Sequence, residues 1–324
     1  QRVWNNMTQY LLAAIPLFIF MASMLEKSGV IEEVFDVAYK WLGRIPGGLA
    51  VATVVASTVL AAMVGVIGAA VVTMALVALP SMLRRGYSPV LAVGTVMAGG
   101  TLGILIPPSV LAIVYGLVAN QSVGELYLGS VFPGLVLSGL YILFSVGYAL
   151  LNPKAAPRLS PEETPTWSER WRALRSIWSP LVLIFLVLGT IFLGLAAPTE
   201  AAAIGAFGAM VVAAIHRRLS WTILRLALEQ TAKATAMVMW IVFGANAFVG
   251  FYIAQGGDRY VSELLLGTGL SPWGILLLMQ GILIVLGMFL DWVGILLLAV
   301  PVFVPIIRDL GFDPLWFGVL YLVN

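Results

Sequence analysis

The chain has 324 residues, of which 61% are hydrophobic and only 10% are charged. Several apolar runs exceed the roughly 20 residues that a helix needs to span a bilayer, so the composition excludes a soluble domain and indicates a polytopic helical membrane protein. The absence of cysteine excludes disulfides, thiolate chemistry and zinc–thiolate sites. The single histidine, His216, lies beside two arginines at a predicted helix end, as an interfacial residue would. With no catalytic triad, P-loop or metal-ligand cluster in the sequence, we expect no enzyme.

The first half of the chain predicts spanning segments, a flat helix and a hairpin. Residues 7–24 form a spanning helix, and residues 31–42 form an amphipathic helix that is too short to span and lies in the interface. Residues 47–85 are apolar but are interrupted at Gly65–Gly68. Each half is shorter than a full span, which predicts a re-entrant hairpin. A broken helix follows, and then a span at residues 131–151.

The second half repeats this alternation after a basic, proline-rich linker at residues 152–176. We expect spans at 177–195, 201–215 and 232–254, short amphipathic helices at 220–230 and 258–267, and a second interrupted hairpin at 272–307. In the second hairpin, residues 287–291 form the tip. A last helix begins at Pro314 and stops inside an apolar segment.

The stretch Gly99–Ser109 interrupts a run that is otherwise typical of a membrane helix. It contains three glycines and the pair Pro107–Pro108, and proline removes a backbone donor and clashes one turn back. In hydrocarbon the freed backbone groups are costly unless protein, ion or water satisfies them. Broken helices of this kind hold ions and substrates in secondary transporters. The alternative is a kink that only shapes helix packing.

An internal repeat supports the transporter interpretation. Residues 80–89 recur as residues 305–314, at an offset of 225, with proline at the first and last positions and glycine at the seventh. With the linker placed in the cytoplasm by the positive-inside rule, all of the 17 Lys and Arg residues except Arg2, Arg259 and Arg308 lie on the cytoplasmic side. The two hairpins then open to opposite sides, so the repeats are inverted, as in many transporters.

The repeat predicts the domain organisation. Residues 1–151 form the first inverted repeat, residues 152–176 form a cytoplasmic linker, and residues 177–324 form the second inverted repeat. The counterpart of the break at Gly99 begins at Asn324. We therefore expect this chain to be an internal piece of a longer protein.

Asp291 is the carboxylate most clearly placed at mid-membrane depth, which makes it a functional candidate. The alternative is a structural acid that neighbouring amides satisfy at the hairpin tip. A proton relay needs several titratable residues in line, and the sequence offers essentially one. Carbonyl-rich breaks with few carboxylates suit Na+, because hard cations prefer oxygen ligands. We expect Na+ as the coupling ion and no cofactor.

Three motifs resemble the large membrane subunit of the tripartite ATP-independent periplasmic (TRAP) transporters. They are Gly-Gly-Thr-Leu-Gly-Ile-Leu-Ile-Pro-Pro-Ser at 99–109, Ala-Pro-Thr-Glu-Ala-Ala-Ala at 197–203 and Gly-Met-Phe-Leu-Asp at 287–291, and Gly311-Phe-Asp-Pro314 is similar too. The resemblance runs over the whole chain. It implies an elevator-type architecture, Na+-driven import of an organic acid across the bacterial inner membrane, a small membrane subunit and a periplasmic substrate-binding protein.

The resemblance also implies the site residues. One ion site lies between the first hairpin tip and the break, with backbone carbonyls as its main ligands. The expected ion-binding residues are Gly65, Val66, Gly68, Ala69, Gly99, Gly100, Thr101, Gly103, Ile104, Pro107 and Asp291. The expected substrate-binding residues are Thr101, Ser109, Gly287 and Asp291.

One position departs from the family pattern. Many members have two serines after the tip glycine, where this chain has Val66 and Ile67. The loss of these hydroxyls makes the pocket less polar and favours a smaller or more apolar carboxylate, such as a 2-oxo acid, over a sugar acid. Two other functions stay open: an ion or anion antiporter that needs no binding protein, and a structural membrane subunit. The net charge of +2 does not indicate a nucleic-acid partner.

Overall fold

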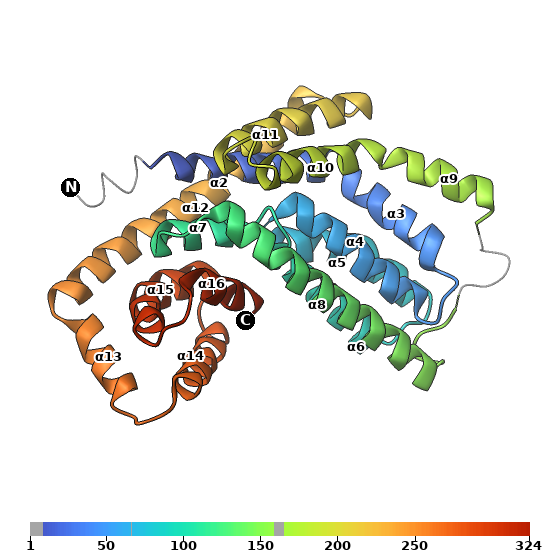
Figure 1. The fold of residues 1–324 in the computed structure, drawn as a ribbon. Coiled ribbons are helices and arrows are strands. Elements are labelled where there is room, and N and C mark those ends of the chain that lie inside the picture. The colour runs from blue at the N-terminus through green and yellow to red at the C-terminus, as the bar shows by residue number, and fades with distance from the viewer. Residues whose placement is uncertain (1–8, 66, 159–164) are drawn as a thin grey trace.

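The computed structural model describes residues 9–65, 67–158 and 165–324, and over these residues every regular element is a helix (Figure 1). Within this part of the chain, five helices are long and apolar enough to cross a membrane, or up to seven if each of two bent pairs counts as one span. The prediction of an all-α polytopic membrane protein is confirmed.

The first predicted span is present and packs in a layer with two later helices. The short 3-10 helix η1 (Tyr10–Ala13) continues into α2 (Ala14–Lys27), which ends slightly later than predicted. Helices α10 (Trp178–Phe192) and α11 (Pro198–Ile215) lie along α2 at the top of Figure 1. At the start of α11, Glu200 Oε2 accepts the Ala197 N–H at 2.9 Å, which caps the helix.

The flat helix is present as α3 (Val30–Leu42). It buries Ile31, Val34 and Ala38 on one face, while Glu32 and Asp36 are exposed on the other. The amphipathic spacing therefore correctly predicts which face packs, here against the first hairpin helix and against α9.

The first hairpin consists of α4 (Gly48–Val64) and α5 (Ile67–Arg84), and α6 (Pro89–Leu105) packs along both. The expectation that all three glycines belong to the break is wrong, because Gly99, Gly100 and Gly103 lie within α6. A Cβ on Gly99 would lie 2.5 Å from Ser57 Oγ of α4, and a Cβ on Gly100 would collide with Val71 of α5. These two glycines therefore allow α6 to approach the hairpin closely.

The break itself is limited to Ile106–Ser109, which contains a cis Pro107–Pro108 peptide bond. After it, α7 (Val110–Ala119) continues at an angle of 41° to α6. The span that follows is α8 (Val123–Leu151), which begins earlier than predicted. It runs diagonally across the α4–α6 hairpin unit in Figure 1.

The predicted linker is only partly irregular. Its last part forms α9 (Trp167–Ser176), which begins with a capping box in which the Thr166 N–H donates to Glu169 Oε2 at 2.7 Å. In return, the Glu169 N–H donates to Thr166 Oγ1 at 3.4 Å. A Thr-x-x-Glu pattern is a known helix start, and it was the available signal for this helix.

The prediction of separate helices at 220–230 and 232–254 is also wrong, because one helix of 34 residues, α12 (Trp221–Ala254), covers both. No glycine or proline lies between the two stretches, so nothing in the backbone interrupts the helix there. The next helix is α13 (Gly257–Leu266), at the far left of Figure 1.

The second hairpin consists of α14 (Pro272–Gly287) and α15 (Trp292–Asp309), and α16 (Pro314–Val323) follows it. Helix α15 meets the length and composition of a membrane span, so the re-entrant geometry of this hairpin stays a prediction. The C-terminal end of α16 lies near the middle of the molecule, beside α7 and α8 (Figure 1).

The helix bounds correspond at the offset seen in the sequence. Helices α5 and α15 begin and end 225 residues apart, and Pro89 and Pro314 both open the helix that follows. Gly86 and Gly311, which precede these prolines, both have positive φ, at 78° and 80°. The division into inverted repeats at 1–151 and 177–324, with a linker between them, stays a prediction.

Candidate functional site at the helix breaks

The tip of the first hairpin lies directly on the broken helix. Gly65 ends α4 in the left-handed conformation, with φ of 61°, and a Cβ there would collide with the carbonyl oxygen of Pro108. The Gly65 carbonyl also accepts the Val110 N–H at 3.4 Å. Two segments that the sequence singled out separately are therefore in contact through their backbones.

The last turn of α6 has carbonyl oxygens without helical partners. The Ile106 N–H donates to Leu102 O at 2.9 Å, which is the last bond of the helix ladder. The next donors would come from Pro107 and Pro108, and proline has no N–H. The carbonyls of Gly103 and Ile104 therefore lack i+4 donors and are free to coordinate a cation.

The remaining residues predicted for this ion site are less closely placed. Gly68 lies in the first turn of α5 and is exposed, with open space where a Cβ would be added. Gly99 and Gly100 face α4 and α5 about two turns before the break. Val66 and the side chain of Ala69 lie outside the described residues.

Ser109 caps α7 beneath the break. Its Oγ accepts the Ala112 N–H at 3.4 Å, its carbonyl accepts the Tyr127 hydroxyl at 3.1 Å, and it is fully buried. Ser109 does not line the cavity described next. The structure therefore gives it a structural role and does not place it beside the other predicted substrate-binding residues.

The tip of the second hairpin ends in Asp291, which caps α15. Asp291 Oδ2 accepts the Val293 N–H at 3.2 Å, as a helix N-cap does. The residue is nonetheless exposed. The Asp291 carboxylate therefore caps α15 and is also accessible to a ligand.

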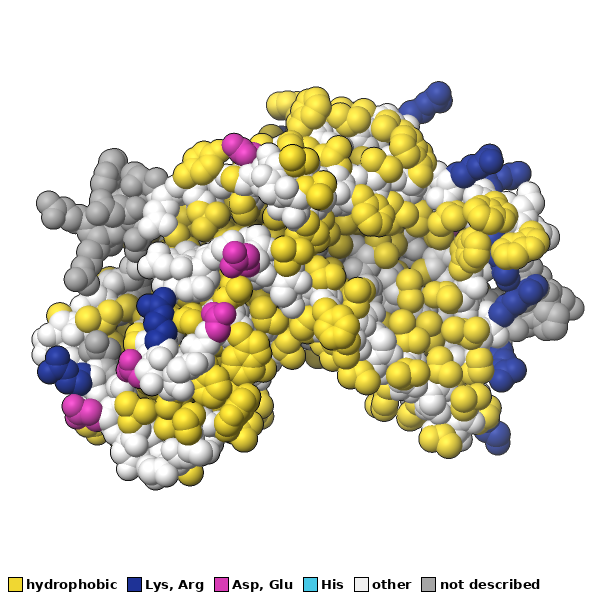
Figure 2. Space-filling model, in the orientation of Figure 1, with side chains coloured by type: hydrophobic (Ala, Val, Ile, Leu, Met, Phe, Trp, Pro, Cys, Tyr) yellow, Lys and Arg dark blue, Asp and Glu magenta, His cyan; other side chains and the backbone are white. Residues whose placement is uncertain are grey.

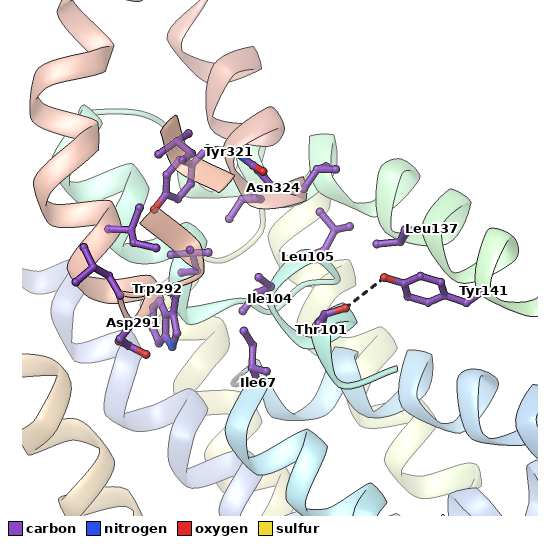
Figure 3. Close-up of a pocket in the computed structure, with 17 residues that line it drawn as sticks. Ile67, Thr101, Ile104, Leu105, Leu137, Tyr141, Asp291, Trp292, Tyr321 and Asn324 are labelled. Atoms are coloured by element: carbon purple, nitrogen blue, oxygen red, sulfur yellow. Dashed lines mark hydrogen bonds between the residues drawn. The ribbon is translucent and has the colours of Figure 1, made fainter. Parts of the chain in front are cut away.

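A cavity of about 510 Å³ joins these segments (Figure 3). Four predicted residues line it: Thr101 and Ile104 from α6, and Gly287 and Asp291 from the second hairpin. Ile67, from the start of α5, also lines it, so the first hairpin tip, the broken helix and the second hairpin tip all reach the same space. Figure 2 shows the molecule hollowed between the lobe of α13–α16 and the lobe of α6 and α8.

Aromatic residues in the cavity wall were missed by the sequence analysis. Tyr141 of α8 extends toward Thr101, and the two hydroxyl oxygens are 3.5 Å apart (Figure 3). Thr101 Oγ1 donates to Ala98 O at 2.7 Å, so the Tyr141 hydroxyl is the donor to Thr101. Trp292 and Tyr321 line the opposite side. A polar side chain inside a long apolar span was the signal that could have identified Tyr141.

The cavity wall is mostly apolar. Among the described residues that line it there is no Lys or Arg, and Asp291 is the single acid. The part of the chain that the structure describes holds no group of three or more His, Cys, Asp or Glu residues. The oxygen ligands available to a cation here are backbone carbonyls, hydroxyls and the Asp291 carboxylate.

Two interrupted hairpins and a proline-broken helix around one cavity are typical of membrane transporters. Residues 1–324 match the family model of the tripartite ATP-independent periplasmic transporter, DctM component, and the chain belongs to this family. It is therefore a multi-pass permease component of a transport system and not an enzyme.

Several relatives extend beyond the chain. The C4-dicarboxylate TRAP transporter large permease protein DctM of Pseudomonas aeruginosa is 34% identical, over 100% of this chain and 75% of its own. The protein of that name from Rhodobacter capsulatus is 31% identical over 100% and 76%. The 2,3-diketo-L-gulonate TRAP transporter large permease protein YiaN of Escherichia coli is 28% identical over 100% and 75%.

The fold also matches a solved structure. The crystal structure of the YdaH transporter of Alcanivorax borkumensis, described as having an unusual topology, aligns with a TM-score of 0.70. The two chains are 17% identical, and the match covers 99% of this chain and 75% of the other. The similarity shows that the two chains share a fold.

Proposed function

We propose that the protein imports an organic acid anion by Na+-coupled secondary transport across the bacterial inner membrane. A periplasmic substrate-binding protein delivers the substrate, and a small membrane subunit completes the transporter. The names of the relatives support this proposal, since they include permeases for C4-dicarboxylates, 2,3-diketo-L-gulonate and sialic acid. A relative from Oleidesulfovibrio alaskensis, an isethionate permease named DctMQ, is 29% identical, and this chain covers 51% of it.

The observation that carries the proposal is the contact of the Gly65 tip with the broken helix beside the shared cavity. Na+ binds between the tip and the free carbonyls of Gly103 and Ile104, where oxygen ligands are concentrated. The substrate occupies the cavity between Thr101 and the second hairpin. Because the described wall has no Lys or Arg, the bound cation supplies the positive charge that an anionic substrate needs. This dependence is the physical basis of coupling.

Transport follows an elevator mechanism in this proposal. The two hairpins, the broken helix α6–α7 and α16 move together, and the long helices α2, α8 and α10–α12 form the scaffold. The extensive packing of α6 on α4 and α5 supports movement of the first hairpin and the broken helix as one unit. The matching helix bounds at an offset of 225 support inverted repeats as its origin.

Uptake by proteoliposomes tests the proposal. The full-length protein and its small subunit are reconstituted, and labelled C4-dicarboxylates, 2-oxo acids and sugar acids are supplied with and without the binding protein. We expect uptake only with the binding protein and with an inward Na+ gradient. Equal uptake after replacement of Na+ by choline would refute Na+ coupling. Uptake that does not need the binding protein would favour the antiporter alternative, and preference for a polyhydroxylated sugar acid would refute the expectation of a smaller, more apolar substrate.

A further inference from the structure

We propose that α9 and the adjoining ends of α3 and α5 form a docking surface for anionic phospholipid headgroups. The surface, called here the basic tryptophan surface, consists of Trp41, Arg84, Trp167, Trp171, Arg172 and Arg175. It lies at the end of the molecule where Lys and Arg side chains gather along the right-hand edge in Figure 2. The inference does not depend on the proposed transport function.

An aromatic cluster fixes α9 on α3. The ring of Trp41 lies 5.7 Å, centroid to centroid, from the rings of both Trp167 and Trp171. The Trp41 Nε1–H also donates to the carbonyl of Arg170 at 3.3 Å. Although they contact Trp41, Trp167 and Trp171 remain 63% and 56% exposed. Tryptophan is enriched where a protein meets the headgroup region, because the indole is amphipathic.

The three arginines of this surface, Arg84, Arg172 and Arg175, are exposed and have no ion-pair partner in the described part of the chain. The Arg170 guanidinium is held over the Trp167 ring at 5.4 Å, which leaves these three arginines as the cations that are free to meet a headgroup. Guanidinium groups bind phosphate oxygens in bidentate geometry, so a phosphate ester supplies what the protein does not.

The position of the surface identifies a membrane lipid as the source of that phosphate. Helix α9 runs into the apolar helix α10 with a bend of 47°, and the two together pass as one broken span. Trp178, at the first position of α10, is 54% exposed. Because α9 is the polar part and α10 the apolar part of this broken span, we place the arginines of α9 at the depth of the headgroups. A soluble protein or nucleic-acid partner would not account for the exposed tryptophans at this boundary.

Lipid binding to the complete transporter tests the inference. The wild type and the variant Arg172→Gln/Arg175→Gln are reconstituted in nanodiscs of phosphatidylcholine, with or without phosphatidylglycerol, and native mass spectrometry counts the phosphatidylglycerol retained. We expect binding to weaken by about fivefold for each charge removed, and thermal stabilisation by phosphatidylglycerol to fall with it. Added salt lowers the difference between the two proteins, because the attraction is screened.

Two further variants keep the result interpretable. Arg259→Gln/Arg308→Gln removes two exposed charges from α13 and α15, at the other end of the molecule (Figure 1), and retains wild-type binding. Arg172→Lys/Arg175→Lys keeps the charge and most of the binding. Equal losses in the Arg172/Arg175 and Arg259/Arg308 variants would show a general charge effect and overturn the proposal. Unchanged lipid binding together with loss of a co-purifying protein would reassign the surface to a protein partner.

Discussion

The carbonyl oxygen of Pro108 occupies the position where a side chain on Gly65 would have to lie. The tip of the first hairpin and the break of α6–α7 are therefore fitted to each other by backbone atoms alone. Because no side chain intervenes, a side chain added at Gly65 alters the geometry of the carbonyls that are proposed to hold the cation. This contact gives the first prediction.

Gly65→Ala is expected to abolish uptake and to lower the thermal unfolding midpoint. The left-handed backbone at Gly65 costs an alanine roughly 1–2 kcal/mol, and the added methyl group also displaces Pro108. Gly94→Ala, in α6, is the matched control, because Gly94 has no left-handed backbone and nothing within 4 Å of an added Cβ. Thermal unfolding and Na+-dependent uptake are measured for both. Full activity of Gly65→Ala would contradict the close contact between the hairpin tip and the Pro108 carbonyl.

Asp291→Asn is expected to abolish Na+-dependent uptake while leaving thermal stability close to that of the wild type. Asparagine is as good an N-cap as aspartate, so the bond to the Val293 N–H survives and only the charge is lost. Asp313→Asn is the control, because Asp313 caps α16 by accepting the Leu315 N–H at 2.7 Å but does not line the cavity. If Asp291→Asn transports normally, Asp291 has only the structural role that the sequence analysis kept as the alternative.

Tyr141→Phe is expected to raise the KM for substrate by about 2- to 10-fold, the range for loss of one hydrogen bond. The phenol lies at the cavity wall beside Thr101, where it can reach the substrate. Tyr148→Phe, further along α8, is the control because Tyr148 lines the neighbouring apolar groove between α6 and α8 but not the cavity. Initial uptake rates over a range of substrate concentrations separate KM from maximal rate. An unchanged KM would remove Tyr141 from the substrate site.

His216→Ala is expected to destabilise the fold by about 1–3 kcal/mol, the cost of leaving buried polar groups unpaired. The two ring nitrogens lie 2.9 Å from the carbonyls of Val212 and Ser176, and Nε2 is 3.3 Å from Glu33 Oε2. His216 thereby joins α11, the junction of α9 with α10, and α3. Equilibrium unfolding in detergent measures the loss.

The control for His216 is Arg225→Ala, which breaks an exposed pair with Glu229 on α12. Such surface pairs contribute less than about 1 kcal/mol. Equal stability of the two variants would show that His216 is an ordinary interfacial residue, as its sequence context suggested.

Local signals predicted most of the helices correctly. Proline and glycine marked the hairpin tips and the starts of α6 and α16, because these residues restrict or free the backbone directly. The extent of the α6–α7 break was harder to predict, because Gly99 and Gly100 are read as helix breakers in isolation. Their role depends on Ser57 and Val71, which approach only after the hairpin folds against α6.

For the cavity too, local motifs predicted some residues, and others depend on tertiary contacts. Thr101, Ile104, Gly287 and Asp291 were predicted from motifs and line it. Tyr141 was not, because its position in the wall depends on the path of α8 past α6, a tertiary arrangement that no local pattern specifies. Ser109 was also predicted from the motif; its hydroxyl caps α7 and does not line this cavity, so its role toward substrate stays a prediction.

Helix α12 is continuous, so its amphipathic first part and its spanning part move as one body. Its 34 residues extend over about 51 Å at a rise of 1.5 Å per residue, whereas the hydrocarbon core is about 30 Å thick. The amphipathic first part cannot pivot independently of the spanning part, so a change of tilt in the bilayer swings both. The packing of α12 on α2 and on α15 therefore sets the tilt of both parts together, and a shift at either contact is transmitted along the whole helix.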